Sequence, residues 1–119
     1  MHKEQIEQAA EKIRSLRLLQ KRQSNYRYAL SKIINCSGTS AANAISNIRL
    51  SIERIQNDID IIMNTIGELE DNNQTIIRLW YFDKQSTKDI MNALYISSVS
   101  GLYKRRDKAL MEFYNTFPW

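Results

Sequence analysis

The chain has 119 residues with only three glycines and one proline, and it carries a net charge of +4 with a pI near 9.3. Glycine and proline are too scarce for a β protein with many tight turns, and the isoleucines recur every three or four residues rather than every second residue. The composition therefore excludes a β-rich fold and predicts an all-α protein. The charge is modest for a nucleic-acid-binding protein but favours a polyanionic partner.

The cysteine content and the sequence motifs limit the localisation and the kind of protein that we expect. Cys36 is the only cysteine, so it cannot form an internal disulfide, and no apolar run has the length of a signal peptide or a membrane span. We therefore expect a cytoplasmic protein that does not enter a membrane. The sequence contains no glycine-rich phosphate loop, no metal-ligand cluster and no nucleophile with a plausible histidine partner, which predicts a non-enzyme without metal or cofactor.

Residues 3–34 have the pattern of one long amphipathic helix, or of two helices with a bend near Gln23, where a polar residue interrupts the repeat. The remaining repeat positions are apolar and spaced by threes and fours: Ile6, Ala9, Ile13, Leu16, Leu19, Tyr26, Leu30 and Ile33. Basic residues occupy other positions of this segment: Lys12, Arg14, Arg17, Lys21, Arg22 and Arg27. An ordinary solvated face is the favoured interpretation of these charges, and a second nucleic-acid-binding surface is the alternative.

A polar loop at residues 35–40 separates this segment from a second helix that begins near Ala41. Its apolar positions alternate steps of three and four, the pattern of a coiled-coil seam: Ile45, Ile48, Ile52, Ile55, Ile59, Ile62, Ile66 and Leu69. The first helix is basic and the second acidic, so we predict an antiparallel hairpin over residues 1–71 with opposite charges along its flanks.

Further apolar residues lie beside the seam: Tyr26, Tyr28, Ile34, Leu50, Ile61 and Met63. Two helices alone bury only one stripe each, so these side chains need another partner. We expect a second copy of the chain, giving a homodimer. The alternative is that they close the core of the monomer.

Residues 72–119 form a second predicted domain of three short helices. The first carries an apolar run over residues 76–82, and Asp71 or Asn72 is its expected cap. Ser86 followed by Asp89 resembles a capping box and predicts a helix from about Thr87, while Ser98 is a second N-cap. A short helix, a tight turn and a basic-faced helix together predict a helix-turn-helix.

The last helix suits duplex DNA, because an α-helix of about 10–12 Å diameter fits a major groove about 12 Å wide. Small residues at its start allow close approach, and basic residues neutralise phosphates or reach guanine edges. The predicted DNA-binding residues are Lys88, Ser97, Ser98, Ser100, Gly101, Lys104, Arg105 and Lys108. The residues predicted to face inward are Val99, Leu102, Ala109, Leu110 and Phe113. The alternative is an ordinary solvated basic face.

This module resembles the fourth region of bacterial sigma factors over residues 76–82, 86–90, 96–100 and 106–110. With the long helical segment before it, the layout is similar to that of ArpU/RinA-type regulators of phage late genes in Gram-positive hosts. Two features depart from the pattern. In the middle of the first helix of the pair, residues 91–93 replace the usual small residue, so the register within that helix could differ by one. The second departure is at the turn. The turn residue that is usually glycine is Tyr95 here, so either the turn has another geometry or Tyr95 adopts a strained left-handed backbone.

The resemblance implies a sequence-specific DNA-binding transcription regulator that activates phage or prophage late genes. The hairpin would then dimerise or contact host RNA polymerase. Two alternatives stay open: a phage DNA-packaging component of the small-terminase kind, and a coiled-coil adaptor that does not bind DNA. The C-terminal aromatics Phe117 and Trp119 either dock on the module or remain available to a partner.

Overall fold

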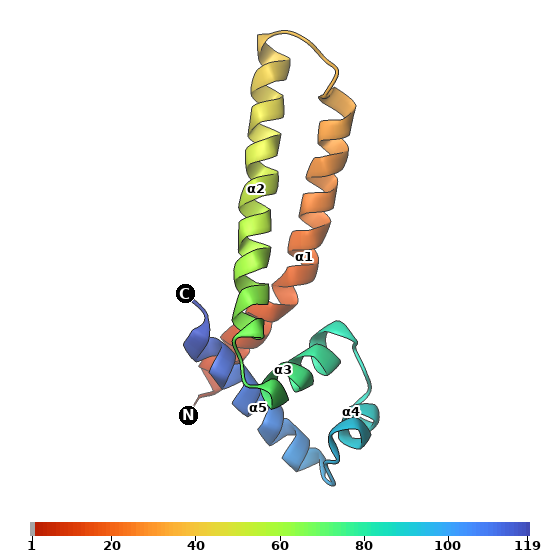
Figure 1. Cartoon of the computed structure of the whole chain (residues 1–119), viewed down its shortest axis with the longest axis vertical. Coiled ribbons are helices and arrows are strands. Elements are labelled where there is room, and N and C mark those ends of the chain that lie inside the picture. The colour runs from red at the N-terminus through yellow and green to blue at the C-terminus, as the bar shows by residue number, and fades with distance from the viewer. Residues whose placement is uncertain (1) are drawn as a thin grey trace. The chain divides into compact units, whose positions relative to one another are not determined.

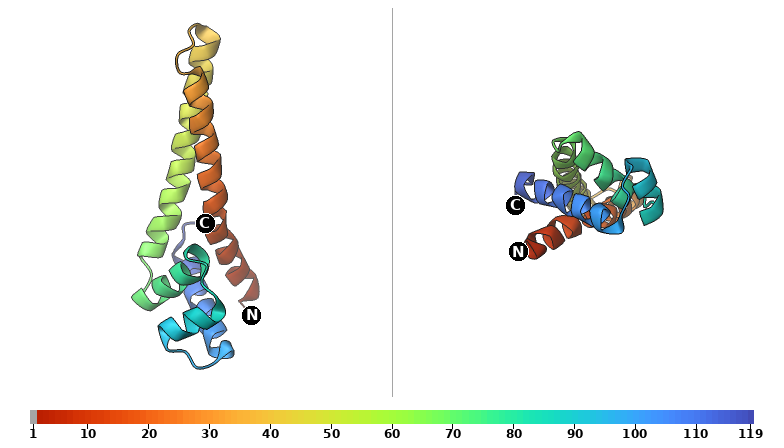
Figure 2. Two further views of the ribbon diagram at one scale, coloured as in Figure 1. Left: turned by 90° about the vertical axis from the view of Figure 1, so that its right-hand side faces the viewer. Right: turned by 90° about the horizontal axis from the view of Figure 1, so that it is seen from below.

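A computed structural model describes residues 2–119, and all of the regular secondary structure in this range is helical, without strands. The predicted all-α class is thus confirmed, and the first two helices form a long antiparallel hairpin (Figures 1 and 2). The elements are α1 (Lys3–Ile33), α2 (Thr39–Gly67), α3 (Asp71–Ile77), the π-helical turn η1 (Arg78–Phe82), α4 (Thr87–Leu94) and α5 (Val99–Thr116). The first helix is continuous through Gln23.

The chain divides into two compact units. The core unit comprises the residues up to Arg14 together with Ile62–Trp119, and the hairpin unit comprises Ser15–Ile61. The first turns of α1 therefore group with the C-terminal helices. The functional boundary expected after residue 71 stays a prediction.

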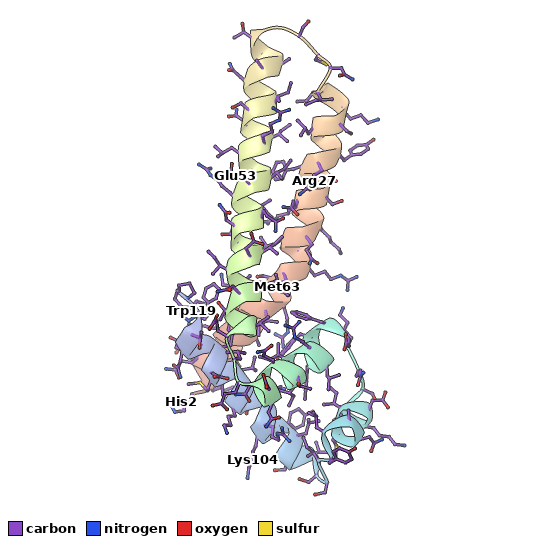
Figure 3. The ribbon with its side chains drawn as sticks, viewed as in Figure 1. His2, Arg27, Glu53, Met63, Lys104 and Trp119 are labelled. Atoms are coloured by element: carbon purple, nitrogen blue, oxygen red, sulfur yellow. The ribbon has the colours of Figure 1, made fainter. Side chains whose placement is uncertain are left out.

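In the hairpin unit, a polar contact occupies the interruption of the apolar repeat in α1. The side-chain amide of Gln23 donates to Gln56 Oε1 at 2.7 Å and to the Ile52 carbonyl at 3.4 Å. Seam residues of α2 toward the loop, such as Ile45 and Ile48, are only half-buried. Figure 3 labels Arg27 on α1 and Glu53 on α2. Within residues 15–61 no close ion pair joins the two helices, so the expected pairing of opposite charges along the flanks stays a prediction.

The core unit has an apolar interior drawn from α1, α2, α3, α4 and α5, whereas η1 contributes no buried residue. Each fully buried Ile, Leu or Phe side chain stabilises the fold by roughly 1.5–3 kcal/mol. The buried apolar residues of this unit are Ala9, Ala10, Ile13, Ile62, Ile66, Leu69, Ile76, Ile77, Ile90, Leu102, Ala109, Leu110 and Phe113. Their positions on α5 confirm four of the five residues predicted to face inward.

The start of α3 is held by a side chain from far along the sequence. Its N-cap residue is Glu70, not the predicted Asp71 or Asn72, and the Glu70 side chain makes no capping bond. Instead Glu112 of α5 accepts hydrogen bonds through Oε1 from the Glu70 backbone N–H at 3.0 Å and from Asn73 Nδ2 at 2.7 Å. This carboxylate satisfies the backbone N–H of the N-cap residue, which has no intrahelical partner, together with the side-chain amide of Asn73, and so links α5 to α3.

Among the described helices, none is long and apolar enough to cross a membrane. The longest, α1 and α2, have 31 and 29 residues. Both carry charged residues along their length, which breaks up any continuous apolar span.

Candidate nucleic-acid interface

The helices α4 and α5 begin at the two serines expected to cap them. Ser86 Oγ accepts from the Asp89 backbone N–H at 3.1 Å, and Ser98 Oγ accepts from the Gly101 backbone N–H at 3.0 Å. Both serines have extended backbones, as N-cap residues do. The predicted spacing of helix, tight turn and helix is confirmed, with residues 95–98 as the turn (Figure 1).

Tyr95 adopts the left-handed conformation that the sequence left as one of two alternatives, with φ 56° and ψ 40°. The turn is fixed by hydrogen bonds from the Tyr95 and Ile96 backbone N–H groups to the carbonyls of Asn92 and Met91. A side chain with a Cβ costs roughly 1–2 kcal/mol in this conformation, and glycine avoids that cost. The tyrosine side chain is nonetheless 95% exposed, so intramolecular packing does not offset the cost.

Gly101 has a structural reason to be glycine that is independent of DNA. A Cβ at this position would lie 2.9 Å from Ser98 Oγ, the oxygen that accepts the capping hydrogen bond. The absence of a side chain therefore makes room for the N-cap of α5. The residue itself is half-buried.

The two faces of α5 differ as a groove-binding helix requires. Leu102, Ala109, Leu110 and Phe113 are buried, whereas the outward-facing set is exposed: Ser100, Lys104 and Lys108. Val99 is 50% exposed, so its predicted inward position is wrong. Side chains lean toward the N-terminus of their helix, and Val99, as the first residue of α5, therefore extends past the helix end instead of onto the core.

Most of the predicted DNA-binding residues lie on one exposed segment. Ser97 and Ser98 precede α5, and Lys104 follows on the half of the helix nearer the turn, where Figure 3 labels it. Lys88 is exposed near the start of α4, whereas Arg105 is half-buried. In the described part of the chain, none of these residues takes part in an ion pair, so their charges are not neutralised by a nearby carboxylate.

Arg106 of α5 contacts Trp80 of η1, a contact that was not predicted from the sequence. Its guanidinium lies 5.1 Å from the ring centroid of Trp80 and 4.8 Å from that of Tyr103, and its Nη2 donates to Asp107 Oδ1 at 2.9 Å. The two rings are themselves 5.7 Å apart. A tyrosine three residues before an arginine on a helix is the signal that predicts such a contact.

The three adjacent aromatics of η1 do not present one stacking platform. All three are half-buried, and Arg14 lies 5.7 Å from the Tyr81 ring. Burial raises the pKa of Tyr81, a shift that Arg14 and Arg106 oppose and Asp107 reinforces. Because the folded pKa exceeds the unfolded value, any stabilisation from this phenol is present below pH 10 and is lost as pH rises through the folded pKa.

The C-terminal aromatics dock on α5. The Trp119 indole N–H donates to the Tyr114 carbonyl at 2.7 Å, and the Phe117 ring stacks on Phe113 at 5.4 Å between centroids. Lys12 Nζ lies 5.4 Å from the Phe117 ring and 5.8 Å from the Trp119 ring. Of the two expectations for this tail, docking is the one observed.

Charge is distributed unevenly between the units. The hairpin unit has seven basic and three acidic side chains, whereas the core unit has ten of each. The net charge of +4 therefore resides in the hairpin unit, and the positive potential of α5 is a local property of its outer face.

Comparison with known proteins assigns no family. A scan against family models, a search of curated proteins and a search of solved structures each found no match. The resemblance to sigma factors and to ArpU/RinA-type regulators therefore stays an expectation from the sequence.

Proposed function

We propose that the protein is a sequence-specific DNA-binding regulator of transcription that inserts α5 into the major groove. The observation that supports this most is the capped α4–turn–α5 arrangement, whose last helix buries one face and exposes Ser100, Lys104 and Lys108 on the other. By resemblance, the regulated genes would be phage late genes and the effect activation.

The outer face of α5 has groups for both positioning and sequence discrimination. Lys104 and Lys108 are four residues apart and so share one face of the helix, where they can pair with phosphates or guanine edges. Ser97 and Ser98 lie at the helix start, where the positive end of the helix dipole also favours a phosphate. These features support DNA as the partner over an adaptor role without DNA.

The hairpin would bring two copies together. Its residues Tyr28, Ile34 and Leu50 are exposed, which supports the expected homodimer. A dimer would present two α5 helices to two half-sites about 34–36 Å apart. Light scattering should give twice the mass of one chain. The mass of a ring of many copies would favour the packaging alternative, and the mass of a single chain would contradict the expected homodimer.

We expect the DNA affinity of the protein to depend modestly on salt concentration. Three exposed lysines, Lys88, Lys104 and Lys108, would neutralise about three phosphates per chain, so log K should fall against log salt with a slope of about −2.7 for each chain that contacts the duplex. Lys104→Ala should reduce the magnitude of this slope by about 1 and leave the unfolding midpoint unchanged. Fluorescence anisotropy with a mixed-sequence duplex at several salt concentrations measures both.

Lys21→Ala is the matched control, because Lys21 is an exposed lysine of α1 in the hairpin unit, the unit that holds the net charge. It should leave the slope as in the wild type. A slope that depends on Lys21 and not on Lys104 would place the DNA on α1 and contradict the proposed interface.

A further inference from the structure

An exposed apolar strip adjoins the polar face of α5. Tyr95 is 95% exposed, Val99 50% and Tyr103 40%, and they follow one another at intervals of four residues from the turn into the helix. Ser100 and Lys104, two of the residues assigned to DNA, immediately follow Val99 and Tyr103 in the sequence. The start of α5 therefore presents apolar and hydrogen-bonding groups side by side.

The strip is held in place although it contributes little to the core. The Tyr103 ring contacts Trp80 and Arg106, and Val99 lies one helical turn before it. Tyr95 is fixed by the backbone hydrogen bonds of the turn in a left-handed conformation that favours glycine. A costly residue with an exposed ring indicates a contact outside the chain.

Resting on the proposed function, we propose that Tyr95, Val99 and Tyr103 contact the 5-methyl groups of thymines in the major groove. The thymine methyl is the apolar group that base edges display in this groove, and an apolar side chain is its natural partner. The neighbouring Lys104 and Ser100 suit phosphates and polar base edges, which makes DNA a better occupant than an apolar protein surface. The strip would thus make the protein prefer sites containing thymine.

Replacing thymine by deoxyuridine removes the methyl and leaves base pairing intact, so it tests this contact directly. On a duplex selected by the wild-type protein, each contacted thymine changed to deoxyuridine should weaken binding about four-fold. Tyr95→Gly and Val99→Ala should each weaken binding to the thymine duplex. Each variant should then be insensitive to deoxyuridine at the position that its own side chain contacts.

Stability separates this role from a structural one. Tyr95→Gly should unfold at a higher urea concentration than the wild type while binding DNA less tightly, and Val99→Ala should keep the wild-type midpoint. Leu18→Ala is the control, because Leu18 is an exposed apolar residue of the hairpin unit. It should alter neither DNA affinity nor the response to deoxyuridine.

Two results would overturn the thymine contact while leaving the proposed function standing. The first is that the wild-type protein binds the thymine and deoxyuridine duplexes with the same affinity. The second is that Tyr95→Gly and Val99→Ala weaken binding equally on both duplexes, so that each variant still shows the full deoxyuridine effect. If the wild-type protein binds no duplex, or if Lys104→Ala leaves its DNA affinity and salt dependence unchanged, the proposed function and this contact are overturned together.

Discussion

Replacing Phe113 by alanine is expected to lower the free energy of unfolding of the core unit by about 3–5 kcal/mol. The side chain is fully buried in α5, and its ring stacks on Phe117 at 5.4 Å. Alanine would remove most of the ring volume and leave a cavity that the surrounding helices can fill only in part. The C-terminal aromatics would also lose the surface on which Phe117 docks.

Urea denaturation followed by tryptophan fluorescence measures this loss, because Trp80 and Trp119, the two tryptophans of the chain, both lie in the core unit. Phe113→Leu is the control, since it keeps much of the volume and should cost less than about 2 kcal/mol. A loss below about 1 kcal/mol for the alanine variant would show that α5 does not pack as described.

Glu112→Ala is expected to cost about 2–4 kcal/mol, although the residue is polar. Its carboxylate accepts from the Glu70 backbone N–H and from Asn73 Nδ2, and Asn73 is 7% exposed. Alanine would leave the buried amide of Asn73 without this acceptor, and each such loss costs about 1–3 kcal/mol. The start of α3 should loosen as a result, which amide hydrogen exchange at residues 70–74 would report.

Two further variants identify the cause. Glu112→Gln keeps the Oε1 acceptor without the charge and should cost about half as much as alanine. The double variant Glu112→Ala with Asn73→Ala should cost less than the sum of the single changes, because the second change removes the unsatisfied amide. Strict additivity, or an alanine variant within about 0.5 kcal/mol of the wild type, would contradict this account of the link between α5 and α3.

Local signals in the sequence were sufficient to predict the two long helices and the starts of α4 and α5, but not the N-cap of α3 or the π-helical turn η1. The repeat of apolar residues gave the extents of α1 and α2, and Ser86 and Ser98 marked the N-termini of α4 and α5, because capping acts within three residues. The same locality explains why Ser100, Lys104 and Lys108 of α5 are exposed as expected, whereas Gly101 and Arg105 of the same predicted set are half-buried.

Contacts between residues far apart in the chain could not be predicted from these local signals. Glu112 and Asn73 are 39 residues apart, and nothing in either neighbourhood indicates the other. The contacts of Lys12 with Phe117 and Trp119 join opposite ends of the chain in the same way. Val99 was misplaced because helical periodicity alone does not indicate which positions of a first turn extend beyond the core.

The most direct test of DNA recognition by α5 is selection from a pool of random-sequence duplexes at two salt concentrations, carried out in parallel with the wild type and a Lys104→Ala, Lys108→Ala double variant. We expect the wild type to enrich one motif containing thymines, with affinity that falls as salt rises, and the double variant to lose that enrichment while keeping its unfolding midpoint. Weak binding without any enriched motif at either salt concentration, or an identical motif bound with equal affinity by both proteins, would contradict the assignment of α5 as the DNA-reading helix.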